Sequence, residues 1–252
     1  MKKYRVEHGV GIIPEGTTEI GIMAFDEPKA MTSIVIPASV KDISCESFVA
    51  CTNLSSIVVA EENEVYDSRD RCNAIMETAT NTLIFGVKTT KIPATTEYIG
   101  DWAFYCNWDI IDMVIPEGVK SIGSWTFKYC INIPKITIPG SVVEICESAF
   151  HGCRSLRNVV LREGVKKIGA YAFSRCENLE RVQLPVGVSD IDMSAFKECD
   201  QLKEISVPYL QTVYYMERMP EELHSLFVER GESSQEMLEP PSLSSLGCEN
   251  HV

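Results

Sequence analysis

The amino-acid sequence predicts a repeat solenoid, a stack of short parallel strands that is mostly β structure and turns with little helix. The first observation is that phenylalanine recurs, in most cases at intervals of 23 residues, at Phe25, Phe48, Phe104, Phe127, Phe150, Phe173 and Phe196. Prolines keep the same period, at Pro14, Pro37, Pro93, Pro116, Pro139, Pro185 and Pro208. In addition, apolar and polar residues alternate before most of these prolines, as in a half-buried strand.

Each unit has the same internal order. From Leu156 one unit reads LRNVVLREGVKKIGAYAFSRC, and from Leu179 the next reads LERVQLPVGVSDIDMSAFKEC. Apolar residues at alternate strand positions point inward, and proline ends the strand because it has no amide hydrogen for the ladder. The next valine and isoleucine return to the interior, and the phenylalanine fills the middle of the coil. One coil buries too little apolar surface alone, so the coils must stack.

The recurring pattern resembles a known family. The frame I-G-x-x-A-F-x-x-C-x-x-L-x-x-I-x-I-P, seen as IGAYAFSRCENLERVQLP over 168–185, is similar to the BspA-type leucine-rich repeats of many bacterial and some protist surface proteins. The resemblance covers about residues 12–208. It implies a leucine-rich-repeat stack, and it implies that the cysteine three residues after the phenylalanine turns the chain inside the core.

The stretch SAFHGCRSLRNVVL from Ser148 offers a possible catalytic dyad, His151 with Cys153. Cys153 shares its repeat position with other cysteines, at Cys51, Cys130, Cys176 and Cys199. We therefore expect buried free thiols, and no third residue that would orient His151 as a base is visible. The sequence has no C-x-x-C pair, and its four histidines lack ligand spacing, so we expect neither a metal nor a cofactor.

One unit, about residues 60–92, is longer than the others and reads AEENEVYDSRDRCNAIMETATNTLIFGVKTTKI. It lacks the periodic phenylalanine. Its apolar runs 74–76 and 83–85 predict a protruding β-hairpin, either packed on the side of the solenoid or gripping a ligand. The repeat pattern resumes only near the end of this unit, which predicts inward strand positions at Val87, Thr90 and Ile92 before Pro93.

Acidic residues precede the predicted hairpin, at Glu61, Glu62, Glu64, Asp67 and Asp70. Calcium is one possible partner for such a group. Because the spacing does not match the D-x-[DN]-x-[DN]-G loop, a solvated charged loop is the expected structure.

The chain divides into three predicted parts. Residues 1–208 form the solenoid of about eight coils, and 1–13 supply a partial first coil. Residues 209–231 form a C-terminal cap, where PEELHSLFVERG predicts a short helix that starts at Pro220, stops at Gly231 and covers the last coil. Residues 232–252 are polar and contain proline, which predicts a disordered tail.

Composition limits the partners. The net charge of −13 and the pI near 4.8 argue against nucleic acid, which needs basic patches. No apolar run is long enough for a membrane span, so no membrane insertion is expected. No continuous apolar segment follows the N-terminal lysines, so the expected location is cytoplasmic as written. The family resemblance implies the cell surface or secretion as the alternative.

The outward strand positions form the candidate binding face. In the later coils they carry charged and amide side chains, at Asp112, Lys135, Asn158, Arg181, Gln183 and Glu204. No aromatic anchor stands among them, although tryptophan and tyrosine are the usual interface hot spots. Trp102, Trp108 and Trp125 fall on the connecting segments instead.

These observations favour a noncatalytic binding or adhesion module that presents a solenoid face to a protein or glycan. The alternative is a structural scaffold that associates with its own copies. An enzyme is the weakest hypothesis, because the sequence has no nucleophile elbow, phosphate loop or metal motif, and we assign no catalytic residue.

Overall fold

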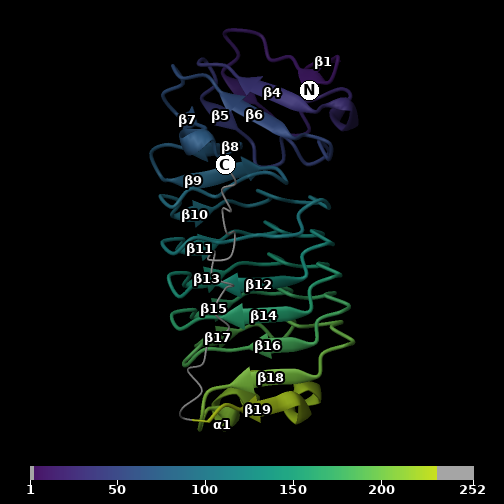
Figure 1. Cartoon of the computed structure of the whole chain (residues 1–252), viewed down its shortest axis with the longest axis vertical. Coiled ribbons are helices and arrows are strands. Elements are labelled where there is room, and N and C mark those ends of the chain that lie inside the picture. The colour runs from purple at the N-terminus through teal and green to yellow at the C-terminus, as the bar shows by residue number, and fades with distance from the viewer. Residues whose placement is uncertain (1–2, 232–252) are drawn as a thin grey trace, which may run out of the picture.

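Successive coils stack along one long axis in the computed structural model, which describes residues 3–231 (Figure 1). The fold is the predicted solenoid of parallel strands with few helices. The tail that was predicted to be disordered, 232–252, lies outside the described residues.

The longer strand of each coil forms the main ladder. Its members are β4 (Ser33–Ile36), β6 (Ser56–Val59), β12 (Lys135–Ile138), β14 (Asn158–Leu161), β16 (Arg181–Gln183) and β18 (Glu204–Val207). Neighbouring strands pair in parallel one repeat apart, so that Lys135 lies opposite Asn158 and Asn158 opposite Arg181. Buried and outward side chains alternate along each strand, as the sequence predicts.

Two-residue strands that the sequence pattern did not reveal form a second ladder, which is divided into a two-stranded N-terminal part and a longer C-terminal part. They are β3 (Glu19–Ile20), β5 (Asp42–Ile43), β10 (Tyr98–Ile99), β11 (Ser121–Ile122), β13 (Glu144–Ile145), β15 (Lys167–Ile168) and β17 (Asp190–Ile191). In each strand the isoleucine points into the core. Two residues are too few for the alternation that identifies a strand in a sequence.

The periodic phenylalanines stack through the core. Phe127, Phe150 and Phe173 are fully buried, and adjacent ring centroids lie 5.0 to 5.2 Å apart. The periodic thiols hold the turn that follows. Cys153 Sγ donates to the Phe127 carbonyl oxygen at 3.2 Å, and Cys176 Sγ bonds the Phe150 carbonyl oxygen at 3.3 Å. These thiols are free, as expected.

The long coil forms the predicted hairpin, but the hairpin does not protrude. Strands β8 (Ala74–Glu77) and β9 (Thr82–Gly86) pair antiparallel, with the short β7 (Tyr66–Asp67) beside β8. On its other side β9 pairs in parallel with β10, so the hairpin belongs to the second ladder and lies inside the stack (Figure 1).

The prediction of protrusion failed because both faces of the hairpin are buried. Ile75 and Phe85 pack into the core of the N-terminal coils, whereas Met76 and Leu83 pack into the core of the C-terminal coils. The hairpin therefore separates two apolar cores within one solenoid.

Two further expectations for this coil were wrong. Phe85 supplies the phenylalanine that seemed missing, because its ring stacks on Phe48 with centroids 4.8 Å apart. The segment 87–92 is a turn and not an inward strand, since the Thr90 hydroxyl ties the Val87 amide to the Asn73 carbonyl oxygen.

The main ladder is interrupted where the next coil should continue it. Residues 110–115 form no strand, and within residues 3–231 no backbone hydrogen bond joins them to either neighbouring coil. In the long coil the strand next to this segment, β9, pairs in the second ladder and not in the main ladder. Residues 110–115 therefore lack one of the two neighbouring strands with which they would have paired. Ile111 and Val114 are 70% and 73% exposed. The expectation that Asp112 lies on a strand was therefore wrong.

Both ends of the stack are covered. At the N-terminus β1 (Val6–Glu7) folds back on β2 (Val10–Gly11), which pairs with β4. At the C-terminus helix α1 (Thr212–Met216) precedes the 3-10 helix η3 (Glu221–Leu226), and β19 (Phe227–Glu229) pairs with β18. The predicted helix to Gly231 thus ends earlier, because its last residues add a strand to the exposed edge of β18.

Two further 3-10 helices lie in the N-terminal half, η1 (Pro28–Ala30) and η2 (Arg69–Arg71). None of the helices within residues 3–231 has the length and apolar content needed to cross a membrane.

Candidate binding surfaces

The structure brings five of the six predicted binding residues onto one sheet face. Lys135, Asn158, Arg181 and Glu204 lie opposite one another across β12, β14, β16 and β18. Gln183 lies in the next row, between Val160 and Ser206. Asp112 is exposed on the preceding coil but outside the ladder. The face is rigid because hydrogen-bonded strands carry it.

Charges on and beside this face are partly neutralised by neighbouring coils. Arg181 Nε lies 3.6 Å from Glu204 Oε2, and Arg157 Nη1 lies 3.1 Å from Glu180 Oε1. These partners stand one repeat apart in the sequence. Such exposed pairs contribute little stability, typically about 0–1 kcal/mol. Lys135 has no ion pair among the described residues, so it presents an uncompensated charge.

The candidate dyad does not assemble. Burial raises the pKa of Cys153 far above its usual range, and its thiol proton is directed to the Phe127 carbonyl oxygen. His151 packs edge-on against Tyr129, with ring centroids 5.5 Å apart. Burial, reinforced by the positive charges of Lys128 and Arg175, lowers the pKa of His151 to about 4. Cys153 therefore stays protonated, and no hydrogen bond in the described part of the chain joins it to His151.

Two of the five acidic residues before the hairpin are paired with basic side chains. Asp67 Oδ2 lies 2.6 Å from Arg69 Nη2, and Glu64 Oε2 lies 3.4 Å from Lys41 Nζ. Throughout residues 3–231, no three side chains of the metal-binding types gather into a site.

A small notch opens where the long coil interrupts the stack of turns. It is lined by Phe48, Cys51, Phe85, Tyr105 and Cys106, among others. Its interior volume of about 10 Å³ is room for one water molecule. It is therefore far too small for a substrate.

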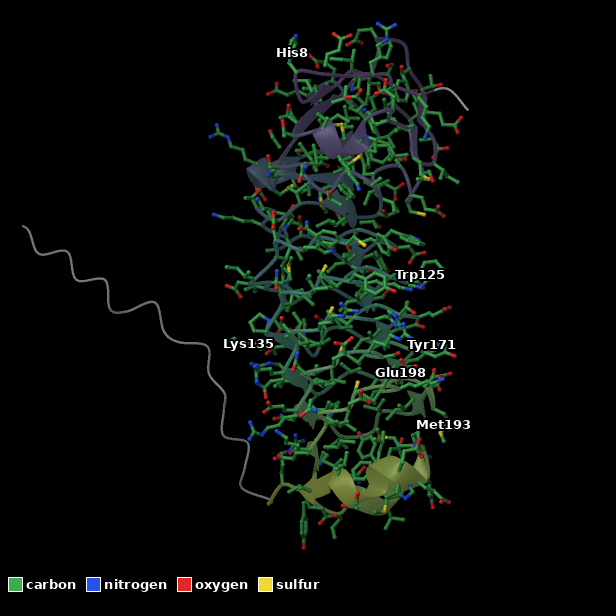
Figure 2. The ribbon with its side chains drawn as sticks, turned by 90° about the vertical axis from the view of Figure 1, so that its right-hand side faces the viewer. His8, Trp125, Lys135, Tyr171, Met193 and Glu198 are labelled. Carbon is green, nitrogen blue, oxygen red and sulfur yellow. The ribbon has the colours of Figure 1, made fainter. Side chains whose placement is uncertain are left out.

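An aromatic surface covers the turns of the middle coils. We call it the aromatic ledge and define it by five half-buried side chains, Trp102, Tyr105, Trp125, Tyr129 and His151. The ring centroids of Trp102 and Trp125 are 4.6 Å apart, and those of Tyr105 and Tyr129 are 6.2 Å apart. Lys128 Nζ lies 5.4 Å from the centroid of Tyr129. In Figure 2, Trp125 points to the side opposite Lys135, so the ledge and the sheet face are separate surfaces.

The ledge rests on a third set of hydrogen bonds between coils. The amides of Trp125, Phe127 and Tyr129 donate to the carbonyl oxygens of Glu147, Ala149 and His151, at 3.0, 2.7 and 2.9 Å. To point these alternate amides in one direction, the backbone takes positive φ at Trp125 (56°) and Tyr129 (61°). The same conformation recurs in the other coils, so the ledge has a fixed backbone.

Sequence reasoning placed the tryptophans on connecting segments but missed the ledge. A signal was present, because Trp102 and Trp125 occupy the same position of consecutive units, two residues before the periodic phenylalanine. The strand positions have no aromatic residue, so strand alternation does not reveal it.

Known proteins share this fold and these periodic turns. The family model described as BspA type leucine-rich repeat region matches six copies, over residues 11–95, 83–140 and 97–218. The chain belongs to this family. No curated protein matches the sequence significantly.

Solved structures of bacterial proteins share the fold of this family member. A leucine-rich repeat protein from Eubacterium ventriosum aligns with a TM-score of 0.67 at 20% identity, over 82% of this chain and 56% of its own. The pneumococcal vaccine antigen PcpA aligns at 0.60 and 23% identity, over 70% of this chain and 45% of its own.

A third structure, a leucine rich cell surface protein from Faecalibacterium prausnitzii, aligns at 0.52 and 26% identity, over 78% of this chain and 52% of its own. The chain thus spans about half the length of these three proteins.

Proposed function

We propose that this BspA-type solenoid is a noncatalytic binding or adhesion module that takes a protein or glycan partner on its outer surface. The observation that carries the proposal is the five-stranded sheet formed by β12, β14, β16, β18 and β19. Its inward side chains fill a continuous core, and its outward side chains are held in rows by the strand register. Outward residues are therefore free to vary for binding without disturbing the fold.

The sheet face is the first candidate for the contact. Lys135, Asn158 and Gln183 make no side-chain hydrogen bond or ion pair within residues 3–231, so they can bond a partner without breaking an internal contact. Their pre-ordered backbone lowers the entropic cost of binding. The similarity to a protein described as a cell surface protein supports an adhesive role.

An array of glycans and extracellular proteins, probed with the purified chain, tests this function. The matched variant is Lys135→Glu with Arg181→Glu, which reverses the charge of the sheet face and leaves the core intact. We expect at least one ligand to bind the wild-type chain and to be lost or weakened roughly tenfold in the variant. A silent array would contradict the binding function, and unchanged binding by the variant would contradict the sheet face as its site.

Deleting the long coil is not a valid alternative test. The β8 and β9 hairpin contributes to both cores, so its removal would disrupt folding as well as any contact.

A further inference from the structure

The aromatic ledge has a regularity that a polymeric ligand would match. Trp102 and Trp125 form one column along the solenoid, and Tyr105, Tyr129 and His151 form a second column beside it. Each step along a column is one coil, close to the 5.0 Å spacing of the phenylalanine rings beneath. A ligand laid along this axis meets aromatic rings on three successive coils. The one-water notch beside Tyr105 leaves no space for a compact small molecule, so contact has to occur on the open surface.

The backbone under the ledge indicates that the aromatic residues are not there for conformational reasons. Trp102 and Trp125 have φ of 61° and 56°, in a region that disfavours bulky side chains by about 1–2 kcal/mol per residue. Glycine or asparagine would take this conformation more easily. At Gly152, φ +70, an added Cβ would lie 2.5 Å from the Tyr129 ring, so the absent side chain leaves room for that ring to lie along the turn.

Polar groups of both signs surround the rings. Asp101 is an exposed carboxylate next to Trp102, and Glu147 is an exposed carboxylate one coil after Trp125. Lys128 lies over the rings of Trp125 and Tyr129. Next to His151, Arg175 is paired with Glu198 at 2.7 Å. These groups offer donors and acceptors for hydroxyl groups, and their two positive and three negative charges leave only one net negative charge, too little to select a strongly ionic ligand.

We propose that the aromatic ledge binds a linear β-1,4-linked polysaccharide whose chain runs along the solenoid axis. Equatorial linkages keep the sugar rings of such a polymer in a straight ribbon with flat, apolar C–H faces, which suit aromatic rings. Its edges carry the hydroxyl groups that the surrounding polar residues can bond. An α-1,4-linked chain coils and leaves a straight row of rings after a few sugars. This inference rests on the proposed binding function and names the ligand class for a second surface.

Titration of the wild-type chain with cellohexaose and chitohexaose, followed by tryptophan fluorescence, tests the inference. Maltohexaose, which is α-1,4-linked, is the ligand control. We expect saturable binding of at least one β-1,4 hexasaccharide and roughly tenfold weaker binding by Trp125→Ala and by Tyr129→Ala. The matched control is Trp108→Ala, because Trp108 is 52% exposed but lies outside the ledge, and it should bind as the wild type does.

A footprint on the wild-type chain covers the case in which the ledge variants fail to fold. N-Bromosuccinimide oxidises exposed indole rings, and the hexasaccharide should protect Trp102 and Trp125 while Trp108 still reacts. Absence of saturable binding, equal binding of maltohexaose, or protection of Trp108 alone would overturn the inference.

The two proposals fail in different ways. If the array reports a partner but neither β-1,4 hexasaccharide binds, the ledge inference is wrong and the binding function stands. If a protein from the array loses binding in Trp125→Ala, the ledge is a protein site and not a glycan site. If array and titration are both silent, both proposals are contradicted.

Discussion

The regular coils and the junction, which we define as the long coil and the segment after it up to about residue 116, bury their apolar side chains in different ways. From Lys135 to Phe196 every coil repeats one arrangement, with a main strand, a two-residue strand and one buried phenylalanine. Between about residues 60 and 92 the period fails, and the hairpin of β8 and β9 fills the gap with apolar residues on both faces. Both ladders are broken at the junction, because the second ladder ends at β7 without pairing to β5 and the main ladder is divided between β6 and β12.

This difference shows which interactions the stack requires. The long coil has no strand in the main ladder, yet it stays in the stack. It keeps a buried phenylalanine, Phe85, and a strand in the second ladder, β9. The accompanying cost is local, because the backbone of 110–115 is left without ladder hydrogen bonds. The stack thus passes the junction through the hairpin, which packs one face on each of the two cores.

The largest expected effect lies in the regular coils. Phe173 is fully buried between Phe150 and Phe196, with centroids 5.2 and 5.5 Å away. Phe173→Ala should lower the free energy of unfolding by about 3–5 kcal/mol, because close-packed neighbours on both sides cannot fill the cavity. Urea denaturation measures the loss. A loss below about 1 kcal/mol would contradict a continuous core in these coils.

At the junction the corresponding key residue is polar. Asn63 is buried, and its side chain binds four backbone groups, the carbonyl oxygens of Pro37 and Val40 and the amides of Val65 and Tyr66. Asn63→Ala should destabilise by roughly 2–4 kcal/mol, because it leaves buried backbone groups without partners. Urea denaturation again provides the measurement.

Asn53 is the control for this prediction. It makes one exposed hydrogen bond, from Nδ2 to the Lys29 carbonyl oxygen at 2.7 Å. Asn53→Ala should therefore cost less than about 1 kcal/mol. Equal losses at both positions would show that Asn63 does not organise the start of the long coil.

His151 on the ledge makes the stability of the regular coils depend on pH. Burial first, then Lys128 and Arg175, lower the pKa of His151 to about 4, and Glu198 opposes them. The unfolded chain therefore binds a proton on this residue at a higher pH than the folded chain does. Stability from the neutral imidazole is present above about pH 6.5 and is lost as pH falls toward about 4.

Thermal denaturation between pH 7 and 4 checks this effect against His151→Phe. Carboxylates titrate in both proteins, so only the difference between them reports on His151. The variant should lose less stability on acidification. Parallel pH profiles would place His151 in solvent and not against Tyr129.

The smallest expected effect is at the sheet face. Arg181 is exposed, and its pair with Glu204 spans 3.6 Å. Arg181→Ala should change the free energy of unfolding by no more than about 0.5 kcal/mol. A large loss in urea denaturation would mean that this side chain supports the stack and is not available for a partner.

The repeat made most of the fold predictable. Phenylalanine, proline and cysteine recur in phase, and each of these residues has one physical role, so the strand and the buried residues of coils such as 158–184 were predictable from the sequence. The junction could not, because Phe85 lies outside the 23-residue period that located the other rings. Two apolar runs predicted a hairpin correctly, but the sequence does not say that both faces find a core.

The surfaces were predictable only in part. Alternation placed Lys135, Asn158 and Arg181 on one face, because strand register follows from the period. It failed for Asp112, whose strand depends on a neighbouring coil that lacks one. The aromatic ledge depends on a turn conformation with positive φ, which strand alternation does not reveal.

Hydrogen exchange across the whole chain, read by mass spectrometry or NMR, tests the central claim that the long coil is built into the stack. Amides of β8 and β9 should be protected nearly as well as those of β12 and β14, and 110–115 should exchange much faster than either. If β8 and β9 exchanged as fast as 110–115, the hairpin would be a peripheral loop, and the division of the core around it would be wrong.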